Sequence, residues 1–311
     1  MRPVSIVLSG LISSRADRGI NFNEVNKFFE DFGKVNKNNE IIVSTYHNEM
    51  NLLNVTSNMK VIINKDPGTN IYRNSLWKFN KKKIKYESNL SRMLTTTLSG
   101  LNNATNEYVI KTRIELIPTD IKYFYEWLEP LINKMESSNL PQIAFLKEHY
   151  SGVIHSIDGT IGGIPDTFQI AKREILQKVW SQSKEIWDKN FSKLTNNKIS
   201  LPITSEQLIG YSYFSLYTNF RVKDKIQKFT RAYNSLSLLR SIIYSEKHLF
   251  NFLHYKETGL SKNYFQGTYS IRFIEFNSKS QVINIFLRLT IVYFKKSKHY
   301  LRRFKREVFI S

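Results

Sequence analysis

Polar and charged side chains stand directly after several predicted strands, where a parallel sheet gathers its ligand-binding residues. Ser9 and Gly10 follow the first apolar run, Asp66 follows the third, and Arg113 and Glu115 close a later one. Arg113 is a permanent cation, and a guanidinium can pair directly with phosphate oxygens. The spacing therefore predicts a ligand site at the carboxyl edge of a sheet.

Four further positions could contribute to such a site. Asn89 and Arg92 lie on the first turn of a predicted helix that leads into the strand before Arg113. Asp158 opens the sequence DGTIGGIP, whose glycines allow a backbone to approach a ligand closely. Glu206 lies in the first turn of a later predicted helix. The acids among them are candidates for acid and base chemistry.

Each acidic candidate also has a structural interpretation. Arg113 and Glu115 have the same side-chain parity on a strand and could form an exposed ion pair. Asp66 precedes Pro and Gly, which is a strong turn sequence, and Asp158 precedes a glycine in the same way. Glu206 stands inside a capping box, where an acid favours the helix dipole.

The elements that must position these residues alternate between strands and helices. Apolar, β-rich runs predict strands over residues 4–10, 40–46, 60–64, 107–116, 143–146 and 153–158, and helical periodicity predicts helices over 22–33, 90–101, 121–135 and 204–217. From about residue 167 the pattern is predominantly helical, including residues 226–253. We therefore predict an α/β fold in which helices flank a mostly parallel sheet and a helical part follows.

Composition limits the class of protein. The 311 residues are 41% hydrophobic, which is enough for a sizeable core, and the absence of cysteine excludes disulfides and thiolate metal sites. A formal net charge of +20 indicates an anionic partner. The sequence contains no GxGxxG, P-loop, HExxH or GxSxG motif, which disfavours the enzymes that depend on them.

The C-terminal segment carries much of the positive charge. Residues 295–306 read KKSKHYLRRFKR, with seven Lys or Arg and no acid. Residues 278–311 are predicted to form a basic amphipathic helix that lies on an anionic membrane surface. Two alternatives are a basic helix that docks on the domain and a nucleic-acid-binding segment. Since no apolar run approaches the 20 residues of a membrane span, we expect a cytoplasmic protein that binds the inner membrane face peripherally.

The stretch NLSRMLTTTLSGLNNATNEYVIKTRIEL resembles the donor half of a GT-A glycosyltransferase. In that class such a strand usually ends in an Asp-x-Asp motif that holds a metal and the nucleotide-sugar. Here Arg113 replaces the first acid and Glu115 occupies the place of the second. The resemblance implies that Glu115 is a ligand of a divalent cation, Mg or Mn, and that Arg113 pairs with phosphates.

More narrowly, the chain is similar to the WavE lipopolysaccharide synthesis family of glycosyltransferases. The matching segments are VLSGLIS, EIIVSTY, VIINKDPG, the block above, HSIDGTIGGIPD and TSEQLIGYSYF, in this order over residues 4–217. The family has Asp at position 115 and usually Gly-Pro where Gly10 and Leu11 stand. The resemblance implies a GT-A-like catalytic domain over 1–220. Helical periodicity predicts a helical extension over 221–277, and the basic tail over 278–311 follows it.

The resemblance also implies roles for the candidate residues. The nucleotide-sugar donor would be bound by seven residues, namely Ser9, Gly10, Asp66, Asn89, Arg92, Arg113 and Glu115. Glu206 would be the catalytic base and Asp158 the contact to the donor sugar, while the acceptor would be a lipopolysaccharide or capsular glycan, free or linked to lipid. Alternatives are a transferase of polyol phosphate with the same fold and a nucleic-acid-binding protein, although no nucleic-acid partner is expected.

Overall fold

The computed structural model describes residues 1–12, 20–46, 53–54, 56–74, 84–138, 141–146, 164–194, 205–217 and 250–253. Its elements in chain order are β1 (Val4–Ser9), α1 (Phe22–Val35), β2 (Glu40–Thr45), β3 (Met59–Ile63), β4 (Asn70–Asn74), β5 (Ile84–Ser88), α2 (Leu90–Asn103), β6 (Tyr108–Thr112), a 3-10 turn (Ile114–Leu116), α3 (Ile121–Glu136), β7 (Ile143–Leu146), β8 (Gln169–Lys172), α4 (Arg173–Leu194), α5 (Ser205–Tyr217) and β9 (Phe250–Leu253).

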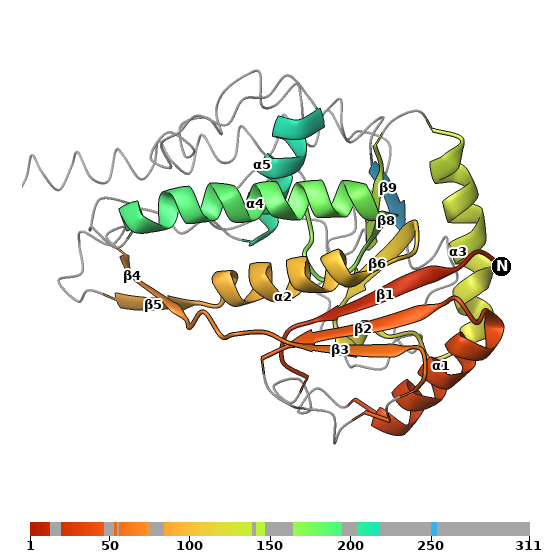
Figure 1. Ribbon diagram of the computed structural model, residues 1–311. Helices are drawn as coiled ribbons and strands as arrows, with labels where there is room; N and C mark the ends of the chain where they lie inside the picture. Colours follow the sequence, from red (N-terminus) through yellow and green to blue (C-terminus); the bar gives the residue numbers. More distant parts are fainter. Residues whose placement is uncertain are drawn as a thin grey trace, which may run out of the picture.

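Seven of these strands form one sheet, in the order β3-β2-β1-β6-β8-β7-β9 (Figure 1). The first four are parallel neighbours, so that Ile6 of β1 pairs with Ile41 of β2 and with Ile110 of β6. Only β8 runs against its neighbours β6 and β7, and β9 is parallel to β7. The predicted α/β fold with a mostly parallel sheet is confirmed.

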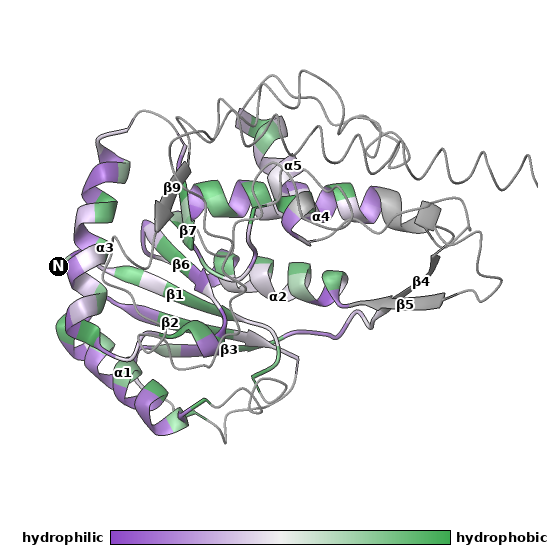
Figure 2. Ribbon diagram, turned by 180° about the vertical axis from the view of Figure 1, so that it is seen from behind, coloured by the Kyte–Doolittle hydropathy of each residue, from purple (hydrophilic) through white to green (hydrophobic). Residues whose placement is uncertain are grey.

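Helices cover both faces of the sheet, because side chains alternate along each strand. Val7, Ile42 and Val109 belong to a core that includes α2, α4 and α5. Their neighbours Ile6 and Ile41 belong to the opposite core, with α1 and α3. In Figure 2, α1 and α3 show hydrophobic and hydrophilic stripes side by side, as expected of helices that bury one face.

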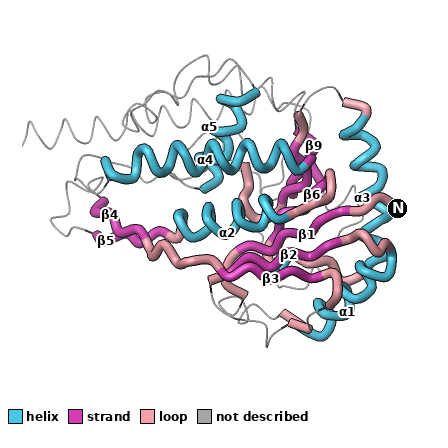
Figure 3. The backbone as a smooth tube through the Cα atoms, in the orientation of Figure 1, coloured by secondary structure: helices cyan, strands magenta, loops and turns pink. Residues whose placement is uncertain are grey.

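Helix α2 approaches the sheet closely at Gly100. A Cβ atom at this position would overlap Cγ1 of Val7 and lie 3.4 Å from Cβ of Ser44. The helix packs against β1 and β2 and lies alongside α4 (Figure 3). Since α2 ends just before β6 begins, its first turn is held at the carboxyl edge of the sheet.

Most local predictions are confirmed within two residues. The predicted strands at 4–10, 40–46, 60–64 and 143–146 correspond to β1, β2, β3 and β7. The helices predicted at 22–33, 90–101, 121–135 and 204–217 correspond to α1, α2, α3 and α5. These segments carry strong periodicity and bury one face or both, which is why local pattern is sufficient to find them.

The strand predicted over 107–116 is partly wrong. β6 ends at Thr112, and a 3-10 turn follows in which the amide of Leu116 donates to the carbonyl of Arg113 over 2.9 Å. Arg113 has extended backbone, whereas Glu115 lies within the turn. The two side chains therefore do not share one face of a strand.

Four strands were not predicted. β8 and β9 lie in segments with helical periodicity, but each pairs with β7 in the main sheet. Pairing with distant strands overrides the local pattern for such short segments. β4 and β5 form a separate antiparallel hairpin. The prediction that residues 221–277 are helical is therefore wrong at Phe250–Leu253.

Several predictions concern residues that lie outside the described ranges. They include the strand over 153–158 with Asp158, the basic tail over 278–311, and the rest of the extension over 221–277. Among the described residues, no helix combines the length and the hydropathy required to cross a bilayer.

Candidate functional site

Four predicted site residues meet at the carboxyl ends of β1 and β6. Because these strands are parallel neighbours, Ser9 and Gly10 lie beside the residues that follow Thr112. A small pocket is lined here by Ser9, Gly10, Arg113 and Glu115, together with neighbouring apolar residues of both segments. Gly10 has φ of +104°, a conformation that other residues rarely adopt, and its amide donates to the carbonyl of Ser44 over 3.1 Å. The pocket thus has a glycine backbone on one side and two charged side chains on the other.

The Arg113 guanidinium is held by an acid that the sequence did not indicate. Its Nη2 lies 2.7 Å from Oδ2 of Asp166, whose side chain is 2% exposed. Asp166 lies three residues before β8, and β8 pairs antiparallel with β6, so the start of β8 reaches the carboxyl edge. The alternative interpretation, an exposed ion pair between Arg113 and Glu115, is not what the structure shows, because Arg113 pairs with the buried Asp166.

A buried lysine completes the group. Lys111 on β6 is 1% exposed, and its ammonium donates to the backbone carbonyl of Asp166. The same ammonium lies 5.1 Å from the centre of the Trp180 ring, a cation–π distance. Gln169 accepts a hydrogen bond from the Trp180 indole at 2.9 Å and donates to the carbonyl of Pro165 at 2.7 Å. Side chains of β6, β8 and α4 therefore fix the segment that carries Asp166.

The charge state of Asp166 follows from these neighbours. Burial alone raises the pKa of its carboxyl, but the positive charges of Arg113 and Lys111 outweigh burial and hold the pKa below its usual value of 3.8. Asp166 is consequently ionised at neutral pH. Lys111, Arg113 and Asp166 together carry one net positive charge.

Glu115 lies inside the protein rather than on its surface. Its side chain is 1% exposed, and the 3-10 turn directs it to the pocket beside Gly10. In the described part of the chain, no three His, Asp or Glu residues are grouped as a metal site would require. Glu115 as a metal ligand therefore stays a prediction.

A second group of predicted residues lies at the end of β3 and the start of α2. Nε and Nη2 of Arg92 donate to the two carboxylate oxygens of Asp66 at 2.8 and 2.5 Å. Asn89 accepts from Nη1 of Arg92 at 3.2 Å, and Asp66 also accepts from the amide of Gly68 at 2.8 Å. Asp66 therefore shapes its turn, as one interpretation predicted, and also holds Arg92 in a bidentate pair.

Neighbouring aromatic residues fix the first turn of α2. The hydroxyl of Tyr46, at the end of β2, donates to the carbonyl of Arg92. Burial raises the pKa of Tyr46 to about 12, so this hydroxyl keeps its proton at neutral pH. The indole of Trp187 on α4 donates to the hydroxyl of Ser91 over 2.8 Å.

The group of Asp66 and Arg92 and the group of Arg113 and Asp166 lie at the same edge of the sheet. The strands that precede them, β3 and β6, are not neighbours. β2 and β1 separate β3 from β6, so the strand axes are about 14 Å apart at the usual spacing. A ligand elongated along this edge could contact both groups.

The proposed catalytic acids are placed less completely. The amide of Ile164 donates to the backbone carbonyl of Glu206 over 2.9 Å, which brings the start of α5 next to the segment of Asp166. The carboxylate of Glu206 accepts from the hydroxyl of Ser205 at 3.1 Å. Asp158 lies outside the described residues.

The sequence contained weak signals for the residues that were missed. Lys111 interrupts an otherwise apolar strand, and a buried lysine requires partners. Asp166 ends the glycine-rich segment at a position that only the pairing of β8 with β6 brings near Arg113. Trp180 gave no signal beyond an apolar helix face.

Comparison with known proteins adds a family. A family model described as WavE lipopolysaccharide synthesis matches residues 4–236, which is about three quarters of the chain. This range contains every element named above except β9. No curated protein matches the chain.

Proposed function

Because the chain belongs to the WavE lipopolysaccharide synthesis family, we propose that it is a glycosyltransferase that moves a sugar from a nucleotide-sugar to a lipopolysaccharide or capsular glycan. The observation that supports this most strongly is the pocket at the carboxyl ends of β1 and β6. It combines a glycine backbone, a fixed arginine and a buried glutamate at the edge where parallel sheets bind ligands.

The donor is proposed to lie along this edge, with its diphosphate between the two arginines. Arg92 on α2 is held by Asp66, which follows β3, and Arg113 follows β6, so an elongated nucleotide-sugar could contact both arginines. Both guanidiniums are already oriented by carboxylates, Asp66 and Asp166. Hydrogen-bonding groups that are already oriented stabilise a negative charge that develops during the reaction. The GT-A character of the fold is part of this proposal.

A divalent cation, Mg or Mn, is proposed to accompany the diphosphate. The pocket is lined by one basic and one acidic side chain, Arg113 and Glu115, so it offers no excess of basic groups to neutralise a diphosphate. Glu115 could supply one ligand, and phosphate oxygens supply others in such sites. Bound there, the cation would stabilise the departing diphosphate. If nucleotide binding is unchanged in EDTA, Glu115 holds no metal.

For the chemical step we propose Glu206 as the base that deprotonates the acceptor hydroxyl and Asp158 as the contact to the donor sugar. Support for Glu206 is its position beside Ile164, two residues from Asp166. A general base contributes about 10²- to 10⁴-fold to rate. Glu206→Gln should therefore lose at least about a hundredfold in turnover with normal nucleotide binding. Retention of a tenth or more would remove it from the mechanism.

The test of the function itself is a screen of nucleotide-sugars for donor hydrolysis, with thermal shift by UDP, CDP, ADP and GDP. Stabilisation and hydrolysis with one donor support the proposal. The nucleic-acid alternative gives a different result, namely no nucleotide effect but DNA affinity that falls steeply with salt. Hydrolysis of an activated polyol phosphate alone would favour the phosphate transferase.

Peripheral binding to the inner membrane face remains a separate proposal, which rests on the basic composition of residues 295–306. Replacement of the seven basic residues of this segment by Gln in the full chain should weaken binding to anionic liposomes strongly, and less so at high salt. Neutral liposomes are the control. Unchanged binding to anionic liposomes would contradict the proposal.

A further inference from the structure

Two buried charged residues, Lys111 and Asp166, are not among the residues proposed above to contact the donor, the acceptor or a metal. Lys111 and Asp166 are 1% and 2% exposed. Every other acidic or basic side chain in the ion pairs of the described residues is at least one-fifth exposed. Burying charge costs free energy unless the group is paired and hydrogen-bonded. An apolar side chain at position 111 would fill the same core position without that cost. The cost therefore calls for a function that an apolar residue cannot perform.

The contacts of the two residues lead to the pocket. Lys111 binds the backbone carbonyl of Asp166, not its carboxylate, so the carboxylate remains directed to Arg113. Trp180 covers the lysine and is itself held by Gln169. The result is a chain of contacts from Trp180 on α4 through Lys111 and Asp166 to Arg113, which lines the pocket.

We propose that Asp166 and Lys111 are positioning residues that hold the Arg113 guanidinium in one orientation at the pocket, ready for a phosphate of the donor. The inference rests on the proposed function and adds to it two residues that lie in the matching segments but received no role in the sequence analysis. Arginine loses side-chain freedom when it binds a ligand. A guanidinium already fixed by Asp166 has lost that freedom during folding, and binding is tighter as a result.

The first test compares two neutralised acids by calorimetric titration with the nucleoside diphosphate that stabilises the wild type. Asp166→Asn keeps the shape but removes the charge that fixes Arg113, and should weaken binding about tenfold or more. Glu107→Gln is the matched control. It neutralises the acid of the ion pair at the other end of β6 and β8 and should change affinity less than about twofold. Equal affinity of Asp166→Asn and wild type would overturn the inference.

A double variant separates positioning from general damage. If Asp166 acts only through Arg113, Asp166→Asn combined with Arg113→Ala should bind no more weakly than Arg113→Ala alone. Losses that multiply would show that Asp166 acts by another route and would contradict the proposal.

Arg113→Lys covers the case in which Asp166→Asn does not fold. This variant keeps the charge but loses the planar fork, and Arg113 is 20% exposed, so the change is easier to accommodate. We expect affinity close to that of Arg113→Ala. Wild-type affinity would mean that charge alone matters and that no orientation is imposed.

A measurement without ligand distinguishes the inference from the proposed function. If the wild type binds no nucleoside diphosphate, the glycosyltransferase proposal fails. The positioning of Arg113 is then decided by NMR of its guanidinium nitrogens. Slow rotation in the wild type that becomes fast in Asp166→Asn supports positioning by Asp166, whereas fast rotation in the wild type excludes it.

Discussion

The strand pair β6 and β8 carries an ion pair at each end. The two ion pairs have similar lengths but very different burial. At the carboxyl end of β6, Arg113 and Asp166 lie 2.7 Å apart, with side chains 20% and 2% exposed. At the amino end, Lys172 and Glu107 lie 2.6 Å apart, with side chains 36% and 62% exposed. Distance alone would rank the pairs as equal. Their burial differs: Asp166 is enclosed by protein and orients Arg113, whereas Glu107 and Lys172 form a pair on the protein surface.

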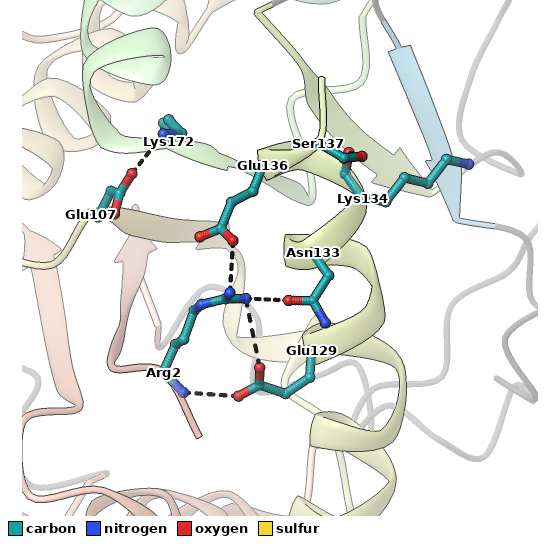
Figure 4. A network of polar contacts seen from close by, with 8 residues as sticks. All are labelled: Arg2, Glu107, Glu129, Asn133, Lys134, Glu136, Ser137 and Lys172. Carbon is teal, nitrogen blue, oxygen red and sulfur yellow. Dashed lines mark hydrogen bonds and ion pairs between the residues drawn. The ribbon is translucent and has the colours of Figure 1, made fainter. Parts of the chain in front are cut away.

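The amino end is rich in such exposed contacts. Figure 4 shows Arg2 reaching α3, where it contacts Glu129, Asn133 and Glu136, with the pair of Glu107 and Lys172 nearby. These contacts tie the N-terminus to α3. Exposed pairs each contribute about 0–1 kcal/mol, so the loss of one is tolerated.

The largest expected effect separates the two ends directly. Asp166→Ala removes the buried carboxylate that pairs with Arg113 and offsets the charge of the nearby buried Lys111, and should lower the free energy of unfolding by about 3–5 kcal/mol. Glu107→Ala makes the same change at the exposed end and should cost less than about 1 kcal/mol. Urea denaturation of both variants measures the difference. Similar losses would show that burial does not distinguish the pairs.

The two ends should also respond to opposite ends of the pH scale. The pKa of Asp166 is held below 3.8 in the folded chain, so its stabilisation is complete above about pH 4 and is lost as pH falls through the folded pKa. The pKa of Lys172 is raised above 10.5, chiefly by its hydrogen bond to Glu107, so its contribution is lost as pH rises through that higher value.

The measurement is the free energy of unfolding against pH for the wild type, Asp166→Asn and Lys172→Gln. In Asp166→Asn, the fall in the free energy of unfolding at acid pH should be smaller than in the wild type. In Lys172→Gln, the fall at alkaline pH should be reduced by a lesser amount. The acid effect should be less than the loss in Asp166→Ala, because protonation keeps the side chain in place. An acid limb identical to that of wild type in Asp166→Asn would contradict the assignment.

A third prediction concerns the helix that brings Arg92 to the carboxyl edge. Gly100→Ala introduces a Cβ atom that overlaps Val7, and overpacking of this kind costs about 1–3 kcal/mol. The shift should also displace Arg92 and weaken nucleotide binding. Ser99→Ala, one residue earlier on the same helix, is the control. Full stability in Gly100→Ala would mean that α2 can move away from β1 without loss.

The smallest effect is expected for the pair of intermediate exposure. Asp66 and Arg92 are 32% and 29% exposed, and Asp66→Asn should cost about 1 kcal/mol or less in stability. Because Asp66 also orients Arg92, nucleotide affinity should fall more than stability suggests. Thermal melts and titrations on one preparation compare the two. A stability loss as large as that of Asp166→Ala would break the relation between burial and cost.

Features that depend on local sequence can be predicted from the sequence, whereas contacts between residues far apart in the chain cannot. Strands β1, β2 and β3 have long apolar runs, and their order of residues was sufficient to place Ser9, Gly10 and Asp66 at the correct edge. Arg113 was recognised because it follows such a run. Its partner Asp166 lies 53 residues further along the chain. The pairing of the four-residue strand β8 with β6 brings the two residues together.

The same limit explains the other errors. The break after Thr112 depends on a 3-10 turn that buries Glu115, and an apolar sequence such as IEL fits a strand equally well. The pairing of Asp66 with Arg92 was not foreseen, although each residue had been identified as a site candidate. Local periodicity finds elements, but ion-pair partners are fixed by how distant elements meet.

The position of β9 bears on how the protein can be shortened. Phe250–Leu253 pairs with β7 and thereby covers its edge, 33 residues after α5 ends. A chain cut at the predicted boundary of residue 220 would leave the amides and carbonyls of β7 open to strands of other molecules, which promotes aggregation. A chain that ends after Leu253 keeps this edge covered, and is therefore the better starting point for crystallisation.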